Sequence, residues 1–156
     1  MKASKHGVTG MALSNEEVQA FKDYLEDASP IPAKVNKEGQ HELDTSVRDA
    51  DVYYIEHEAE NLYEILQKIA KMVNLYFKYD LTGIEKAQIM HYKSPSNGYS
   101  YHIDLSASES EVSRKVSVSI LLNDDYEGGE MCFRTSEEGS CQKPSAGNVI
   151  AFSSFI

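Results

Sequence analysis

The stretch that decides the fold of this 156-residue chain is Tyr-Ser-Tyr-His-Ile-Asp, YSYHID, at positions 99–104. Side chains alternate between the two faces of a β-strand, so positions i and i+2 share one face. A strand over 99–105 therefore places His102 and Asp104 on the same side of a sheet. One imidazole and one carboxylate are two of the three ligands in the 2-His-1-carboxylate triad that holds non-haem Fe(II). A second histidine would complete the triad, but none of the five histidines follows Asp104.

Short apolar strands are predicted on both sides of this stretch, at 88–92, 115–122, 130–133 and 147–152. The strand at 115–122 alternates most strictly, with Val116, Val118 and Ile120 at every second position. Ser, Pro, Asn and Gly in 93–98 predict a turn or flexible loop, and 106–113 is predicted as a solvated loop. We expect 36–51 and 93–98 to form mobile lids over a pocket.

Two helices are predicted before these strands. Ser14 and Glu17 have the spacing of a capping box at the start of the first helix, and Pro30 and Pro32 end it. The second helix is predicted over 59–79, where apolar residues recur at helical spacing and would pack against a sheet: Leu62, Ile65, Leu66, Ile69, Val73 and Phe77. Between the helices, 36–51 is predicted as a loop and 52–55 as a short strand.

This order of elements predicts a single α+β domain over 1–156, with a jelly-roll or barrel-like sheet. Residues 1–82 would be mainly helical support, and 83–156 would supply the strands. The formal net charge of -10 argues against nucleic acid or an anionic membrane as the main partner. No apolar run is long enough to span a membrane and no signal peptide is recognisable, so we expect a cytoplasmic location.

The sequence contains two cysteines, Cys132 and Cys141. Their spacing matches neither a disulfide framework nor a zinc-binding pair. We expect free thiols in a reducing cytosol, and a bridge across adjacent strands is the alternative.

Several motifs in order make the His-x-Asp pattern specific. From Gln88 onward the chain resembles the prolyl 4-hydroxylase-like branch of the Fe(II)/2-oxoglutarate dioxygenases, and a weaker resemblance begins near Val47. The matching elements, in order along the chain, are Gln88-Ile89-Met90-His91-Tyr92, Gly98-Tyr99 with His102 and Asp104, Arg114 opening a strand that ends at Leu122-Asn123, Gly128-Gly129-Glu130, and Pro144 with Gly147 and Phe152.

This resemblance implies a double-stranded β-helix of the jelly-roll or cupin-like type and a set of site residues. His102 and Asp104 would bind Fe(II), and Tyr92 would bind a carboxylate of the cosubstrate 2-oxoglutarate. Tyr99 would line the iron and substrate pocket, and Arg114 would stand at the substrate mouth. From the residues alone, Tyr92 can also be a core tyrosine, and Arg114 a surface residue paired with Glu109 or Glu111.

The implied activity is hydroxylation of a prolyl residue in a peptide or protein, with Fe(II), 2-oxoglutarate and O₂ as cofactors and ascorbate as reductant. The alternatives are the same chemistry on another residue or a small molecule, and a cupin-like binding module without turnover. Relatives continue past the position of Ile156 into a distal histidine and a basic cosubstrate ligand. We therefore expect this chain to be incomplete as a catalyst, and we expect a bacterial or phage source.

Overall fold

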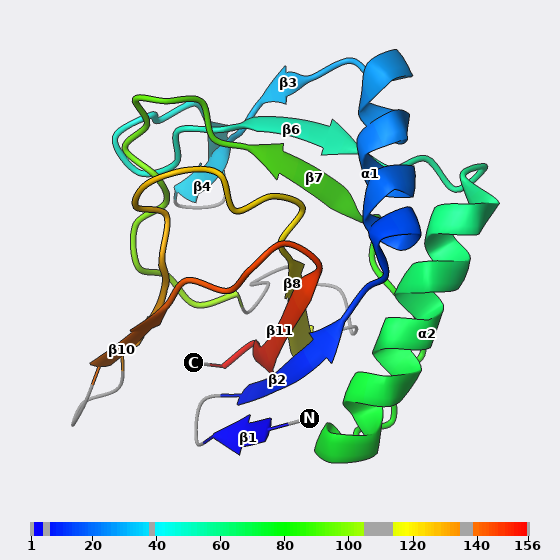
Figure 1. Cartoon of the computed structure of the whole chain (residues 1–156). Helices are drawn as coiled ribbons and strands as arrows, with labels where there is room; N and C mark the ends of the chain where they lie inside the picture. The colour runs from blue at the N-terminus through cyan, green and yellow to red at the C-terminus, as the bar shows by residue number, and fades with distance from the viewer. Residues whose placement is uncertain (1, 5–6, 38–39, 105–113, 135–138, 156) are drawn as a thin grey trace.

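The computed structural model describes residues 2–4, 7–37, 40–104, 114–134 and 139–155, and Figure 1 shows their arrangement. Every strand pairing in these ranges is antiparallel. The largest sheet has the order β1-β2-β11-β8. Its strands are β1 (Lys2–Ser4), β2 (Gly7–Ala12), β8 (Val116–Ile120) and β11 (Asn148–Ser153).

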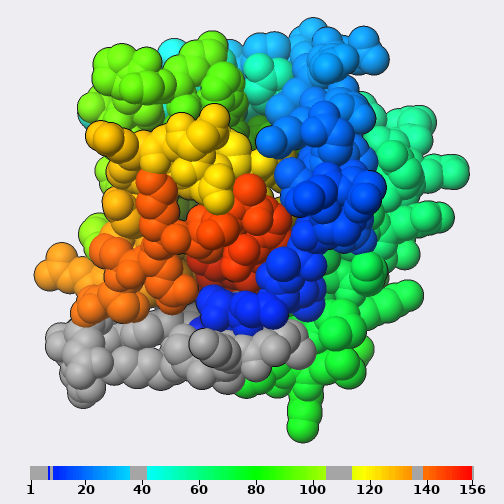
Figure 2. Space-filling model, viewed as in Figure 1, coloured from blue at the N-terminus to red at the C-terminus, as the bar shows by residue number. Residues whose placement is uncertain are grey.

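Strand β11, near the C-terminus, brings the two ends of the described chain together by strand pairing. It pairs with β8 in continuous register from Val149↔Ile120 to Ser153↔Val116. On its other side it pairs with β2, and Figure 2 shows the N-terminal residues beside this C-terminal segment at the surface. The sequence predicts mainly helical support before residue 83. The structure instead places two strands of the main sheet there, because strand pairing depends on partners far away in the chain.

A second sheet has the order β3-β6-β7 and consists of β3 (Ile31–Pro32), β6 (Asp51–Tyr54) and β7 (Gln88–His91). The strands predicted at 52–55 and 88–92 are thereby confirmed within one residue. The predicted loop 36–51 is wrong in part, because β4 (Val35–Lys37) pairs with β5 (Gln40–Glu42) as a short hairpin. Backbone hydrogen bonds form this hairpin. The sequence does not predict it, because the segment has no apolar pattern.

The two predicted helices are confirmed. Helix α1 (Asn15–Asp27) begins with the predicted capping box, in which the Glu17 N–H donates to Ser14 Oγ at 3.2 Å and the Ser14 N–H to Glu17 Oε2 at 2.8 Å. Helix α2 (Glu60–Phe77) ends at Lys78, whose φ of 55° breaks the helical path. In the described part of the chain, no helix is long and apolar enough to cross a membrane.

Helix α2 contributes to two buried clusters and so links the sheets. The first cluster combines α1, α2, β7 and the residue after β6 and contains Phe21, Ile55, Leu62 and Ile89. The second packs α2 against β11 and contains Ile69, Val73, Val149 and Ala151. This packing confirms that the apolar stripe of the second helix supports a sheet. Figure 1 shows both helices on one side of the strands.

Strands β9 (Met131–Arg134) and β10 (Gly139–Gln142) form a separate hairpin. Cys132 and Cys141 lie opposite one another in its register, and a disulfide bond joins them. The prediction of free thiols is therefore wrong for this structure. The antiparallel pairing brings two residues separated by nine positions directly together, and the spacing of the cysteines in the sequence does not show that register.

Candidate metal and cosubstrate site

The stretch 99–104 is not the strand that the sequence predicts. It has a single β-bridge, between Arg48 and Tyr99, and residues 100–104 follow an irregular path. Next to this bridge, the Asp49 N–H donates to the Gly98 carbonyl at 2.9 Å and the Ser100 N–H donates to the Val47 carbonyl at 2.8 Å. The two segments expected to form lids are thus hydrogen-bonded to each other at the site, and their mobility stays a prediction.

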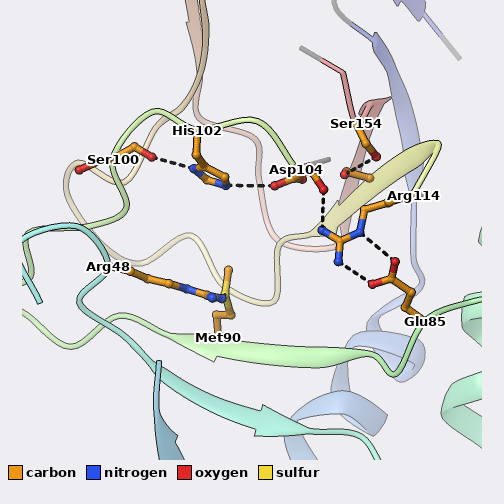
Figure 3. Close-up of polar contacts among 9 residues, drawn as sticks. Arg48, Glu85, Met90, Ser100, His102, Asp104, Arg114 and Ser154 are labelled. Atoms are coloured by element: carbon orange, nitrogen blue, oxygen red, sulfur yellow. Dashed lines mark hydrogen bonds and ion pairs between the residues drawn. The ribbon is translucent and has the colours of Figure 1, made fainter. Parts of the chain in front are cut away.

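The side chains of His102 and Asp104 nevertheless converge. His102 Nε2 lies 3.0 Å from Asp104 Oδ1, and on the other side of the ring Nδ1 lies 2.7 Å from the carbonyl oxygen of Ser100 (Figure 3). A carbonyl only accepts, so the geometry assigns a proton to Nδ1. Nε2 and Oδ1 therefore lie at hydrogen-bond distance from each other, and a proton can be shared between them.

The two side chains stabilise each other in their charged forms. The hydrogen bond to Asp104 is the main reason why the pKa of His102 is raised, with burial acting in the opposite direction. The same hydrogen bond is the main reason why the pKa of Asp104 is lowered. The pair is partly shielded from solvent, with side-chain exposures of 38% for His102 and 22% for Asp104.

Tyr99 lies directly against this pair. Its ring stacks on the imidazole of His102 with the ring centroids 3.7 Å apart. On Tyr99, the guanidinium carbon of Arg48 lies 4.8 Å from the ring centroid. Tyr99 therefore lies beside the candidate ligands, and its role as a wall of the iron and substrate pocket stays a prediction.

Tyr92 follows β7 and is near the same cluster. Burial raises the pKa of its hydroxyl, and the charge of Arg48 and a hydrogen bond from that side chain oppose the shift. The structure thus connects Tyr92 with Tyr99 through Arg48. His91, one position earlier, is exposed and takes no part in these contacts.

Arg114 is held between Asp104 and a residue that the sequence analysis does not single out. Its Nη1 donates to the backbone carbonyl of Asp104 at 3.1 Å. Its Nε and Nη2 donate to the two carboxylate oxygens of Glu85, at 3.2 and 2.5 Å. The alternative partners Glu109 and Glu111 lie outside the described residues.

The donor types of His102 and Asp104, an imidazole nitrogen and a carboxylate oxygen, are those of two positions of an Fe(II) site, and in this structure the two atoms contact each other. Within the ranges that the structure describes, no group of three or more His, Cys, Asp or Glu side chains gathers to hold a metal ion. The metal-binding role of His102 and Asp104 therefore stays a prediction.

Two residues of this cluster, Arg48 and Glu85, are not predicted from the sequence. Arg48 lies in a segment predicted as a polar loop, and Glu85 lies in the irregular stretch between α2 and β7. Neither has a local pattern that signals a site. The weak resemblance that begins near Val47 is the one sequence feature that could have drawn attention to Arg48.

The chain is similar to known proteins in sequence and in fold. Residues 87–156 match the 2OG-Fe(II) oxygenase superfamily. Prolyl 4-hydroxylase 1 of Arabidopsis thaliana is 26% identical over 155 residues, which cover 90% of this chain and 54% of that protein. The chain thus spans about half the length of this relative.

A solved structure of a prolyl-4-hydroxylase from Pseudomonas putida matches with a TM-score of 0.64 and 20% sequence identity, covering 97% of this chain and 82% of that one. The shared fold and the family imply a double-stranded β-helix, divided here into several short antiparallel sheets. The family match, the sequence similarity and the common fold together show that the chain resembles the prolyl 4-hydroxylase-like 2OG-Fe(II) oxygenases, as its motifs predict.

Proposed function

We propose that this chain carries the domain of an Fe(II)- and 2-oxoglutarate-dependent dioxygenase that hydroxylates a prolyl residue of a peptide or protein. The observation that carries the proposal is the convergence of His102 Nε2 and Asp104 Oδ1 at 3.0 Å, with Tyr99 stacked beside them. The similarity to proteins named prolyl 4-hydroxylases supports the choice of substrate residue.

In this proposal, His102 and Asp104 hold Fe(II), and the Ser100 carbonyl keeps the proton on Nδ1 so that Nε2 can bind the metal. Arg114 fixes the backbone of Asp104. With 2-oxoglutarate and O₂, bound Fe(II) supplies the oxidising chemistry that inserts one oxygen atom into a C–H bond and yields succinate and CO₂. Ascorbate would keep the iron reduced.

The remaining residues would place the two organic molecules. Tyr92 would donate its hydroxyl proton to a carboxylate of 2-oxoglutarate, since a phenol with an ordinary pKa of about 10 is protonated near neutral pH. Tyr99 would form a wall of the substrate pocket. Arg114 would contact the substrate if the peptide displaced Glu85, which now occupies two of its nitrogen atoms. The domain would act as a single unit.

The test uses the full-length product of the gene with Fe(II), 2-oxoglutarate, ascorbate and a proline-rich peptide. We expect succinate to form together with a peptide that gains the mass of one oxygen atom. His102→Ala and Asp104→Ala should abolish both products. His91→Ala is the matched control, because this exposed histidine lies outside the cluster, and it should retain activity.

Two other results would change the proposal in defined ways. Succinate formation with an unmodified peptide would assign the same chemistry to another residue or a small molecule. A protein that binds neither Fe(II) nor 2-oxoglutarate would instead be a cupin-like module without turnover.

A further inference from the structure

Two arginines, Arg48 and Arg114, lie near the His102–Asp104 pair. They differ in whether a carboxylate neutralises their charge. Arg114 donates to both carboxylate oxygens of Glu85, so its positive charge is neutralised. Among the described residues, no carboxylate forms an ion pair with Arg48. Figure 3 shows that Arg48 extends from its loop toward Met90, apart from the Arg114–Glu85 pair.

The guanidinium of Arg48 also has an unused donor. Its Nε atom is buried and has no hydrogen-bond partner in the described part of the chain. Its Nη2 atom contacts the sulfur of Met90, which is a weak acceptor. A buried donor without an acceptor is costly, and an arginine presents a planar fork that matches the two oxygens of a carboxylate.

The location of Arg48 indicates a ligand site. Its backbone is bridged to Tyr99, its guanidinium lies over the Tyr99 ring, and that ring stacks on His102. Its charge also acts on Tyr92, where it opposes the burial that raises the pKa of the hydroxyl. We infer that Arg48 is the anion-recognition residue of this site, and that its guanidinium binds a carboxylate group of the ligand held beside His102 and Asp104.

This inference rests on the proposed function for the identity of the ligand. A carboxylate near Tyr92 would belong to the dicarboxylate cosubstrate, and a carboxylate over Tyr99 would belong to an acidic group of the substrate. The two sources share one chemistry, which is an anion with two oxygens bound by a forked cation. Binding measurements with separate probes can distinguish them.

The experiment measures binding by titration calorimetry with three probes: 2-oxoglutarate, succinate, and an acidic proline-containing peptide together with its amidated form. Succinate lacks the 2-oxo group and therefore tests carboxylate recognition without chelation of a metal. The variants are Arg48→Gln, Arg48→Met, which keeps the apolar stem over Tyr99, and Arg48→Lys. Arg134→Gln is the matched control, because this arginine is exposed on β9.

Both charge-removing variants should bind at least one carboxylate probe about 10- to 100-fold more weakly, since hydrogen bonds to charged groups have that strength. Arg48→Lys should recover part of the loss, and Arg134→Gln should bind like the unaltered protein. A loss for succinate and 2-oxoglutarate assigns the cosubstrate carboxylate. A loss for the acidic peptide alone assigns the substrate.

The inference is overturned if the affinities for all probes are the same with and without Arg48, or if the unaltered protein binds none of them. Circular dichroism of each variant shows whether the fold is retained, and Arg48→Lys provides the comparison if Arg48→Gln unfolds. Failure of the proposed function is distinguishable. Carboxylate binding that needs Arg48 in a protein without turnover would refute the oxygenase and leave the anion site in place.

Discussion

Arg114 and Glu85 form a two-pronged ion pair, with Nε 3.2 Å from Oε1 and Nη2 2.5 Å from Oε2, while Nη1 of the same arginine donates to the Asp104 carbonyl at 3.1 Å. Figure 3 shows that Arg114 of this ion pair also contacts Asp104, the candidate metal ligand. The contact joins the segment before β7 to the start of β8. Asp104 thereby receives support from two parts of the chain that are distant in sequence.

We expect Arg114→Ala to weaken metal binding by about 10- to 100-fold, since losing a partner that orients a metal ligand typically has that effect. Glu85→Gln should have a smaller effect in the same direction, because it acts through Arg114. Titration with Co(II), followed by absorption spectroscopy, measures the affinity. Arg134→Ala, on the exposed side of β9, is the control, and an unchanged affinity in Arg114→Ala would show that Asp104 does not need this support.

Removal of the helix cap should destabilise the protein. Ser14→Ala loses the acceptor for the Glu17 N–H at 3.2 Å, and the free energy of unfolding should fall by about 0.5–2 kcal/mol. Urea denaturation followed by circular dichroism measures this change. Ser29→Ala, at an exposed position beyond the end of α1, should leave the midpoint unchanged. Equal midpoints for both variants would contradict a stabilising role of the cap.

The stability of the protein should depend on the protonation of Glu17. The hydrogen bond from the Ser14 N–H and the contact with Lys68 hold the pKa of Glu17 below its ordinary value. Its contribution to the free energy of unfolding is therefore fully present above the unfolded-state pKa of about 4.3, and it is lost as the pH falls through the lower folded-state pKa.

Glu17→Gln should thus be less stable than the unaltered protein near neutral pH, and the difference should shrink in acid. Unfolding curves recorded at several pH values measure it. Glu26→Gln, at an exposed position of the same helix, is the matched control for loss of one charge. A difference that stays constant from neutral to acidic pH would refute the stabilising interaction of the charged form.

The disulfide between Cys132 and Cys141 should stabilise the β9–β10 hairpin. The loop that it closes is short, with a sequence separation of nine. Replacing both cysteines with serine should therefore lower the free energy of unfolding by about 2–3 kcal/mol in the chain-entropy account. A thiol reagent should detect no free cysteine in the oxidised protein and two after reduction in denaturant. Two reactive thiols without prior reduction would contradict the bond.

Local sequence patterns were sufficient to predict the positions of the helices and of several strands. The capping box at Ser14 and the apolar spacing in 59–79 predict α1 and α2 because a helix is built from neighbouring residues. Strict alternation predicts β8 and short apolar runs predict β7 and β11, because the side chains of a strand alternate between a buried and an exposed face, although the partner strands stay unknown. The pairing of β2 with β11 has no such signal, because it joins residues from opposite ends of the described chain.

For the candidate site as well, some features follow from the sequence and others only from the tertiary structure. The sequence by itself determined the chemistry of the pair, because the donor atoms of His102 and Asp104 belong to the side chains themselves. The tertiary structure alone decided that they converge from an irregular segment, that Arg48 lies over Tyr99, and that Glu85 holds Arg114. The contacts of Arg48 with Tyr99 and of Arg114 with Glu85 join segments separated by tens of residues, so the packing of the whole domain decides them.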